Sequence, residues 1–174
     1  MTKDEADVHV ERWRDHWVLE RPFDDDIEAM TVRIGQIQRW FKSTSKDAMA
    51  EVGLQDFEYE TLHALMIRDT PGHASPGELA QEMGVSNAGV TGRLDSMEKK
   101  GWLKRMPDAG DRRRVEVEAT REGLRLWRQA MNLRGSAEDD VAQVLTPSEL
   151  GTLNKLLKKM TLHIESLGDS TAEK

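Results

Sequence analysis

Apolar residues recur at alternating steps of three and four positions in two long stretches, one before and one after the centre of the chain. In the first stretch these positions are Ile27, Met30, Ile34, Ile37 and Phe41. In the second they are Leu150, Leu153, Leu157, Met160, Ile164 and Leu167. Such steps place side chains on one face of a helix, as in a coiled coil. The pattern therefore predicts two long amphipathic helices, each with an apolar stripe.

Local signals place further boundaries around these helices. A helix is predicted over residues 5–20, where Trp17 continues an apolar face. The polar run at residues 43–46 predicts a break in the first long helix. At the other end, residues 168–174 are expected to form a frayed tail.

Between the two stretches the chain carries the start and stop signals of two short helices. Residues 75–78, Ser-Pro-Gly-Glu, form a capping box, with proline at the first helical position. Gly84 supplies a tight turn, Ser86 can cap the second helix, and Gly101 ends it. Two short helices joined by a tight turn are typical of a helix-turn-helix.

A β-hairpin is predicted directly after these helices. Residues 102–106 form its first strand, residues 107–110 its turn, and the alternation of Val115, Val117 and Ala119 its return strand. A long helix then starts at Thr120. The predicted fold class is mainly α with a small β-hairpin wing, a winged helix-turn-helix with N- and C-terminal dimerisation helices.

Charge is distributed unevenly along this acidic chain, whose formal net charge is −7. Residues 1–30 hold ten acidic and four basic side chains, a net charge of −6. Residues 86–114 hold eight basic and four acidic side chains, a net charge of +4. DNA binding depends on local charge, because phosphates meet one surface only. The basic window covers the second short helix and the hairpin, which indicates that these elements contact DNA.

The second helix of a helix-turn-helix can lie in the major groove. Its exposed N-terminal part would present small or hydrogen-bonding residues, namely Ser86, Asn87, Ala88, Thr91 and Gly92. The wing tip would present Asp111, Arg112, Arg113 and Arg114. Arginines suit a narrow, electronegative minor groove, and Asp111 can orient one of them. An arginine-rich turn by itself is more often solvated surface. Here a helix-turn-helix is followed directly by the hairpin, and the basic window lies over both, which favours DNA contact.

Residues 79–103, LAQEMGVSNAGVTGRLDSMEKKGWL, resemble the helix-turn-helix of the MarR (multiple antibiotic resistance regulator) family. Residues 105–120 resemble the wing of that family, whose Asp-x-Arg hallmark is Asp111 and Arg113 here. The resemblance extends over about residues 27–167 and departs mildly at Ala119, where leucine is usual. It implies a homodimer that binds double-stranded DNA at a pseudo-palindromic operator and is usually released by a small ligand.

The added N-terminal helix resembles the urate-responsive branch of the family. This resemblance implies a ligand site made by Trp17, Glu60, Arg93 and Arg105. Arginines bind planar anions bidentately and tryptophan offers a stacking face. The branch has aspartate where this chain has Glu60, so we expect a small anionic effector other than urate, or weaker urate binding. The alternative stays open that Trp17 is core, Glu60 is surface, and the arginines bind phosphate or neighbouring acids.

Four segments are expected: residues 1–22 as the added N-terminal helix, 23–54 as N-terminal dimerisation helices, 55–120 as the DNA-binding domain, and 121–174 as C-terminal dimerisation helices and tail. Each apolar stripe offers more apolar surface than one thin domain can cover, which favours a homodimer. An antiparallel pair of the two stripes within one chain is the alternative.

Other classes of protein find less support in the sequence. The five histidines are scattered and there is no Gly-rich phosphate loop, so we expect no enzyme, no catalytic residue and no cofactor. No metal site is expected, although His9 and His16, seven positions apart, keep a metal-responsive regulator as an alternative. A winged-helix protein-interaction module without DNA binding is the other alternative.

The sequence also bears on the compartment in which the chain acts. It has no cysteine, and therefore no disulfide or thiolate zinc site. No apolar run approaches the roughly 20 residues of a membrane-spanning helix, and the polar N-terminus is unlike a secretory signal. We therefore expect a cytoplasmic protein without a membrane partner.

Overall fold

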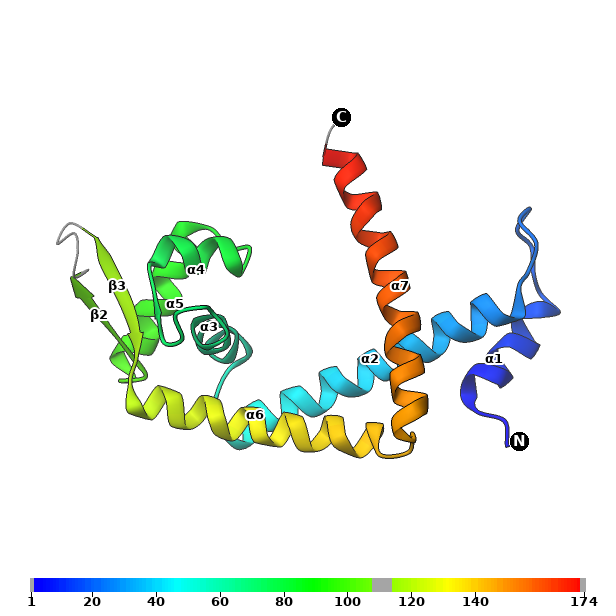
Figure 1. The fold of residues 1–174 in the computed structure, drawn as a ribbon, viewed down its shortest axis with the longest axis horizontal. Helices are drawn as coiled ribbons and strands as arrows, with labels where there is room; N and C mark the ends of the chain where they lie inside the picture. Colours follow the sequence, from blue (N-terminus) through cyan, green and yellow to red (C-terminus); the bar gives the residue numbers. More distant parts are fainter. Residues whose placement is uncertain (1, 108–113, 173–174) are drawn as a thin grey trace. The chain divides into compact units, whose positions relative to one another are not determined.

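The computed structural model describes residues 2–107 and 114–172 (Figure 1). Its elements in chain order are α1 (Glu5–Arg14), α2 (Asp25–Glu51), α3 (Asp56–Met66), β1 (His73–Ala74), α4 (Pro76–Glu82), α5 (Asn87–Lys99), β2 (Leu103–Pro107), β3 (Val115–Ala119), α6 (Arg121–Ala142) and α7 (Pro147–Ala172). The predicted fold class, mainly α with a β wing, is confirmed.

The chain divides into two compact units, residues 1–134 and residues 135–174. The first unit holds every element from α1 to β3 and most of α6, and the second holds the end of α6 and all of α7. Gly135, the first residue of the second unit, lies inside the continuous helix α6.

The sheet has three antiparallel strands in the order β1-β3-β2. In the predicted hairpin, Leu103 pairs with Ala119 and Arg105 pairs with Val117. The predicted turn at residues 107–110 lies largely outside the described residues. Strand β1 was not predicted, because two residues are too few to show an alternation; Ala74 joins the sheet by pairing with Val117.

The core lies between helices α3, α4 and α5 and the sheet. Its fully buried large side chains include Leu62, Leu65, Leu79, Leu94, Met97, Leu103 and Val117. Gly123 lets α6 lie against the backbone that follows α5, since an added Cβ would overlap the carbonyl group of Trp102. This contact fixes the start of α6 against the winged helix-turn-helix.

The predicted helix caps are present. The Oγ of Ser75 accepts a hydrogen bond from the backbone N–H of Glu78, and the Glu78 carboxylate accepts from the backbone N–H of Ser75. The hydrogen bonds that the backbone N–H and the hydroxyl of Ser75 donate to the Glu78 carboxylate lower the pKa of Glu78, helped by the charges of Arg68 and Arg114. Gly84 has a φ of +63° in the tight turn, a backbone conformation that favours glycine.

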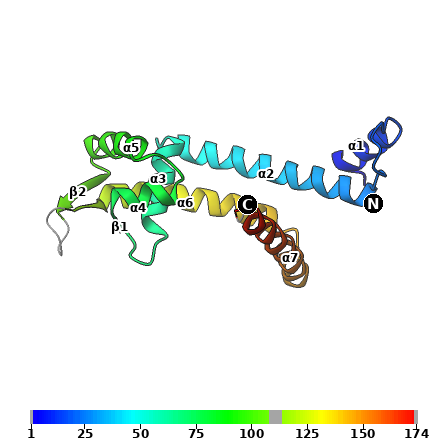
Figure 2. The same cartoon turned by 90° about the horizontal axis from the view of Figure 1, so that it is seen from above.

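Helix α1 packs on the N-terminal half of α2 through buried Ala6 and Val10 and through ion pairs (Figure 2). The Arg33 guanidinium lies 2.8 Å from Asp4 and 2.6 Å from Asp7. Its hydrogen bond lowers the pKa of Asp4 to about 2. The prediction of a helix to residue 20 is wrong, because α1 ends at Arg14 and turns follow.

Helix α2 is continuous, so the predicted break at residues 43–46 is wrong. The hydroxyl of Thr44 donates to the carbonyl oxygen of Trp40 at 3.1 Å, which satisfies it within the helix. Buried Ala48 and Met49 then hold the end of α2 against the core. Helix α7 also runs past its predicted end, through Gly168 to Ala172.

Candidate nucleic-acid interface and ligand site

Helix α5, here called the reading helix, presents a small polar surface at its N-terminal end. All five residues predicted to contact bases are exposed, namely Ser86, Asn87, Ala88, Thr91 and Gly92. The Oγ of Ser86 caps the helix by accepting from the backbone N–H of Gly89 at 3.1 Å. On the opposite face, buried Val90, Leu94 and Met97 anchor the helix in the core. The exposed turn is thus held rigidly and is free of bulky side chains.

Strands β2 and β3 form the base of the wing beside the reading helix. Three of the predicted wing-tip residues, Asp111, Arg112 and Arg113, lie outside the described residues. Arg114 follows them directly, is exposed and leads into β3. The observed pairing of β2 with β3 therefore brings both ends of the tip segment to the same end of the sheet.

The structure brings Glu60 and Arg93 together. The Nη1 of Arg93, on the reading helix, lies 3.2 Å from the Oε2 of Glu60, on α3. The guanidinium also lies over the ring of Phe57, 5.7 Å from its centroid. The side chain of Glu60 is 59% exposed and that of Arg93 is 26% exposed. An ion in solution can therefore reach this pair.

Arg105, at the base of the wing, has different partners. Its Nη1 lies 2.6 Å from Asp95 and 2.8 Å from Glu98, both on the reading helix. Its Nη2 donates to the carbonyl oxygen of Thr91 at 3.3 Å, and its backbone N–H donates to Glu98 at 3.0 Å. Arg105 therefore fastens the wing to the reading helix, and an anion that competed for it would loosen this connection.

Trp17 does not meet the other three predicted ligand residues within one chain. It follows α1, where its indole N–H donates to the carbonyl oxygen of Arg21 at 2.7 Å and its ring packs edge-on against Phe23 at 4.9 Å. This is the N-terminal end of α2, whereas Glu60 lies near the C-terminal end of that helix (Figures 1 and 2). A helix of 27 residues is about 40 Å long.

Several cations of the basic window are paired with acids inside the first unit. Besides Arg93 and Arg105, Lys104 lies 2.8 Å from Glu118. Lys100 lies 2.6 Å from Glu58, a carboxylate that is completely buried. Glu58 was not predicted to be a buried ion-pair partner; its spacing of three positions from the capping residue Gln55 was its only signal in the sequence. Part of the positive charge of the basic window therefore stabilises the fold through ion pairs and is not available to bind DNA phosphates.

A polar cluster between α3 and α6 was also missed. The Trp127 indole N–H donates to the Nδ1 of His63 at 3.3 Å, and the His63 ring stacks on Tyr59 at 5.3 Å. The Tyr59 hydroxyl accepts from Arg134 at 2.5 Å and donates to the sulfur of Met131 at 3.1 Å. Burial lowers the pKa of His63, and the charge of Arg134 lowers it further. These hydrogen bonds join residues that are 64 and 75 positions apart in the chain, which helix spacing cannot reveal.

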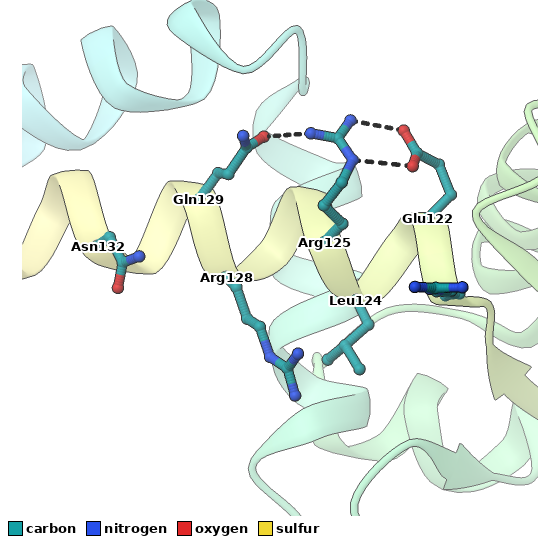
Figure 3. Close-up of a pocket in the computed structure, with 7 residues that line it drawn as sticks. Glu122, Leu124, Arg125, Arg128, Gln129 and Asn132 are labelled. Atoms are coloured by element: carbon teal, nitrogen blue, oxygen red, sulfur yellow. Dashed lines mark hydrogen bonds and ion pairs between the residues drawn. The ribbon is translucent and has the colours of Figure 1, made fainter.

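A cavity of about 510 Å³ lies along one side of α6 (Figure 3). Arg121, Arg125 and Arg128 line it at helical spacing. The guanidinium of Arg125 is occupied, because it donates to both carboxylate oxygens of Glu122 and to the side-chain oxygen of Gln129 (Figure 3). The lining of this cavity is therefore basic, and Glu122 already neutralises part of its positive charge.

Neither histidine of the metal alternative belongs to a cluster of side chains that could bind a metal ion in the described part of the chain. His9 lies 3.0 Å from Glu28, and the Nδ1 of His16 contacts the backbone oxygen of Arg12 at 2.8 Å. Within residues 2–107 and 114–172, no group of three histidine, cysteine or acidic side chains is close enough to hold a metal ion. In the same part of the chain, no helix has the length and apolar character needed to cross a membrane.

A rigid helix with a small polar N-terminal turn, preceded by a short helix and followed by a β-wing, defines the class of winged helix-turn-helix DNA-binding proteins. The MarR family profile matches residues 58–115, from α3 to the start of β3. The regulator PecS of Dickeya dadantii is 32% identical over 158 residues, which cover 89% of this chain and 92% of PecS. The chain belongs to the MarR family of transcriptional regulators.

Solved structures share the fold. YusO of Bacillus subtilis superposes with a TM-score of 0.68 at 19% identity, over 82% of this chain and 99% of that chain. A mutant MarR of Escherichia coli complexed with operator DNA superposes with a TM-score of 0.58 at 23% identity, over 80% of this chain and 99% of that chain. The profile match and the similarity to PecS confirm the sequence-based assignment to the MarR family, and the urate-responsive branch is consistent with the similarity to PecS.

Proposed function

We propose that this chain is a transcriptional repressor that binds a pseudo-palindromic operator as a homodimer in the cytoplasm and is released by a small anion. The observation that carries DNA binding is the exposed, capped N-terminal turn of the reading helix. Asn87 and Thr91 offer hydrogen-bonding groups there, and Ala88 and Gly92 allow close approach to base edges. The related MarR structure with operator DNA supports this use of the fold.

Homodimer formation is supported by two exposed apolar stripes. On α2 the exposed large residues are Ile27, Met30, Ile34, Ile37 and Trp40. On α7 they are Leu150, Leu153, Leu156, Leu157, Leu162, Ile164 and Leu167. Contiguous exposed apolar surface marks an interaction site. The four-segment division, with residues 23–54 and 121–174 as dimerisation segments, remains part of this proposal.

Ligand release is supported by the ion pairs of the two predicted arginines. Arg93 and Arg105 belong to the elements that would touch DNA, and each is held by acids that a small anion can replace. An anion that bound one arrangement of these elements more tightly would shift their position. Because Trp17 lies at the other end of α2, its proposed stacking role requires the second chain of the dimer.

A gel-shift titration tests the proposed function. We expect the full chain to retard the intergenic fragment beside its own gene, provided that the fragment contains an inverted repeat. Retardation should weaken steeply with salt, as phosphate contacts require, and an unrelated duplex should bind far more weakly. Asn87→Ala should reduce the preference for the fragment, whereas Asn132→Ala on α6 serves as a matched control. No binding to the fragment at low salt would favour the protein-interaction module instead.

A further inference from the structure

Helix α4, the first helix of the helix-turn-helix, carries two acidic side chains and no basic one. Glu78 and Glu82 are four positions apart, so both carboxylates lie on the same face of this short helix. In proteins of this class the first helix crosses the DNA backbone. A negative face on that helix would repel the phosphates, so DNA binding requires a counter-charge for these two acids.

Arg68, in the turn between α3 and β1, supplies this counter-charge. Its Nη1 lies 2.5 Å from the Oε2 of Glu82, and its Nη2 lies 3.4 Å from the Oε2 of Glu78. Glu78 has further support, because it caps α4 and feels the charge of Arg114. Glu82 has no other ion-pair partner among the described residues. Within this part of the chain, neutralisation of Glu82 therefore depends on Arg68.

Burial fixes the Arg68 side chain in this place. The side chain is 18% exposed, whereas that of Glu82 is 34% exposed. The Nε of Arg68 is buried and has no hydrogen-bond partner among the described residues. Because a buried polar atom without a partner costs free energy, packing alone does not favour arginine over an apolar side chain of similar length. The ion pairs with α4 are what arginine adds at this position.

We infer that Arg68 is a positioning residue for DNA binding, which neutralises the acidic face of α4 and so lets this helix approach the phosphates. Arg68 acts through Glu82 and does not itself contact DNA. This inference rests on the proposed binding of operator DNA. Because phosphates are the same in every sequence, Arg68 should affect the affinity for all duplexes and leave the preference for the operator unchanged.

A double-mutant cycle in gel shifts tests the inference. Arg68→Met keeps a long side chain in the buried position and removes the charge. We expect it to weaken binding to the intergenic fragment and to an unrelated duplex by the same factor, about five- to thirtyfold. Glu82→Gln removes the exposed negative charge, so Arg68→Met/Glu82→Gln should regain most of the lost affinity. Glu82→Gln alone should bind at least as tightly as the unchanged chain.

Two further variants serve as controls. Arg68→Lys keeps the positive charge and should keep most of the affinity. Arg125→Met removes an arginine that lies 2.6 Å from Glu122 on α6, a comparable ion pair outside the helix-turn-helix, and should leave DNA binding unchanged. Circular dichroism establishes that each variant is folded.

The cycle separates neutralisation from the other roles that Arg68 could have. If Arg68 contacted phosphate directly, Glu82→Gln would not restore binding to Arg68→Met. If the ion pair only held the fold together, Glu82→Gln alone would weaken binding as Arg68→Met does. Either result, or unchanged binding by Arg68→Met, would overturn the inference while DNA binding by the chain still holds. If the unchanged chain retards neither duplex at low salt, the proposed function and this inference are both wrong.

Discussion

At the scale of single residues, Arg113 carries the expected contact of the wing with the minor groove. The residue lies outside the described part of the chain, so the expectation rests on its place in the Asp-x-Arg motif. Arg113→Ala should weaken binding to all operator sequences by about 1–3 kcal/mol. It should also flatten the salt dependence, because one fewer counterion is released. Gel shifts at several salt concentrations measure both effects.

Asp111→Ala separates an orienting role from simple repulsion. If Asp111 orients Arg113, its removal should reproduce much of the loss caused by Arg113→Ala, although a negative charge has been taken away. Tighter DNA binding by Asp111→Ala would instead mean that the carboxylate only repels phosphate, and the proposed geometry of the wing tip would be wrong.

Gly123 is the residue whose replacement tests the packing of α6. A methyl group at this position would overlap the backbone carbonyl of Trp102 and lie 3.3 Å from the side chain of Leu62. Backbone cannot move aside cheaply, so we expect Gly123→Ala to lower the free energy of unfolding by about 1–3 kcal/mol. Thermal or urea unfolding followed by circular dichroism measures the change.

Gly135 on the same helix provides the control for Gly123. An added Cβ at Gly135 meets no atom within 4 Å. Because alanine is favoured over glycine inside a helix by about 0.8–1.0 kcal/mol, Gly135→Ala should stabilise the chain or leave it unchanged. Equal destabilisation by both substitutions would show that the close approach at Trp102 is not what distinguishes Gly123.

At the scale of elements, the packing of α3 on α6 should depend on pH through His63. Burial disfavours the charged form of its ring, and Arg134 disfavours a positive charge nearby. The Nδ1 of His63 also accepts from the Trp127 indole, which requires the neutral ring. The folded state therefore lowers the pKa of His63 below its ordinary value of 6.5. The corresponding stability is complete above pH 6.5 and is lost as the pH falls through the lowered pKa.

Thermal unfolding between pH 7.5 and 5 measures this dependence. We expect Tm to fall with pH in the unchanged protein. His63→Gln keeps an acceptor for Trp127 but does not titrate, so the variant should show a smaller fall over the same interval. If the two pH profiles coincide, the other histidines and the acids account for the effect and His63 does not.

At the scale of the whole molecule, we expect a dimer with twice the chain mass of 19.8 kDa. Light scattering at micromolar concentration measures it. Leu157→Glu places a charge in the α7 stripe and should favour the monomer and weaken operator binding. Val144→Glu changes an apolar residue that is 78% exposed but belongs to neither stripe, so its dimer should persist. A monomeric unchanged protein that still binds the operator tightly would contradict the dimer.

The sequence by itself determined the features that arise within a few residues. The caps at Ser75 and Ser86, the turn at Gly84 and the pairing of β2 with β3 follow from local hydrogen bonding and side-chain alternation. The MarR resemblance follows from the same short segment. The prediction of a break at residues 43–46 was wrong. Tertiary contacts of Ala48 and Met49 stabilise the continuous helix α2 although its local helix signals are weak.

Only the tertiary structure decided which distant charges meet. Arg93 pairs with Glu60, whereas Arg105 pairs with Asp95 and Glu98. Trp17 lies at the other end of α2, against Phe23. Sequence spacing identifies which residues share one helix face, whereas contacts between helices depend on where the core places each helix.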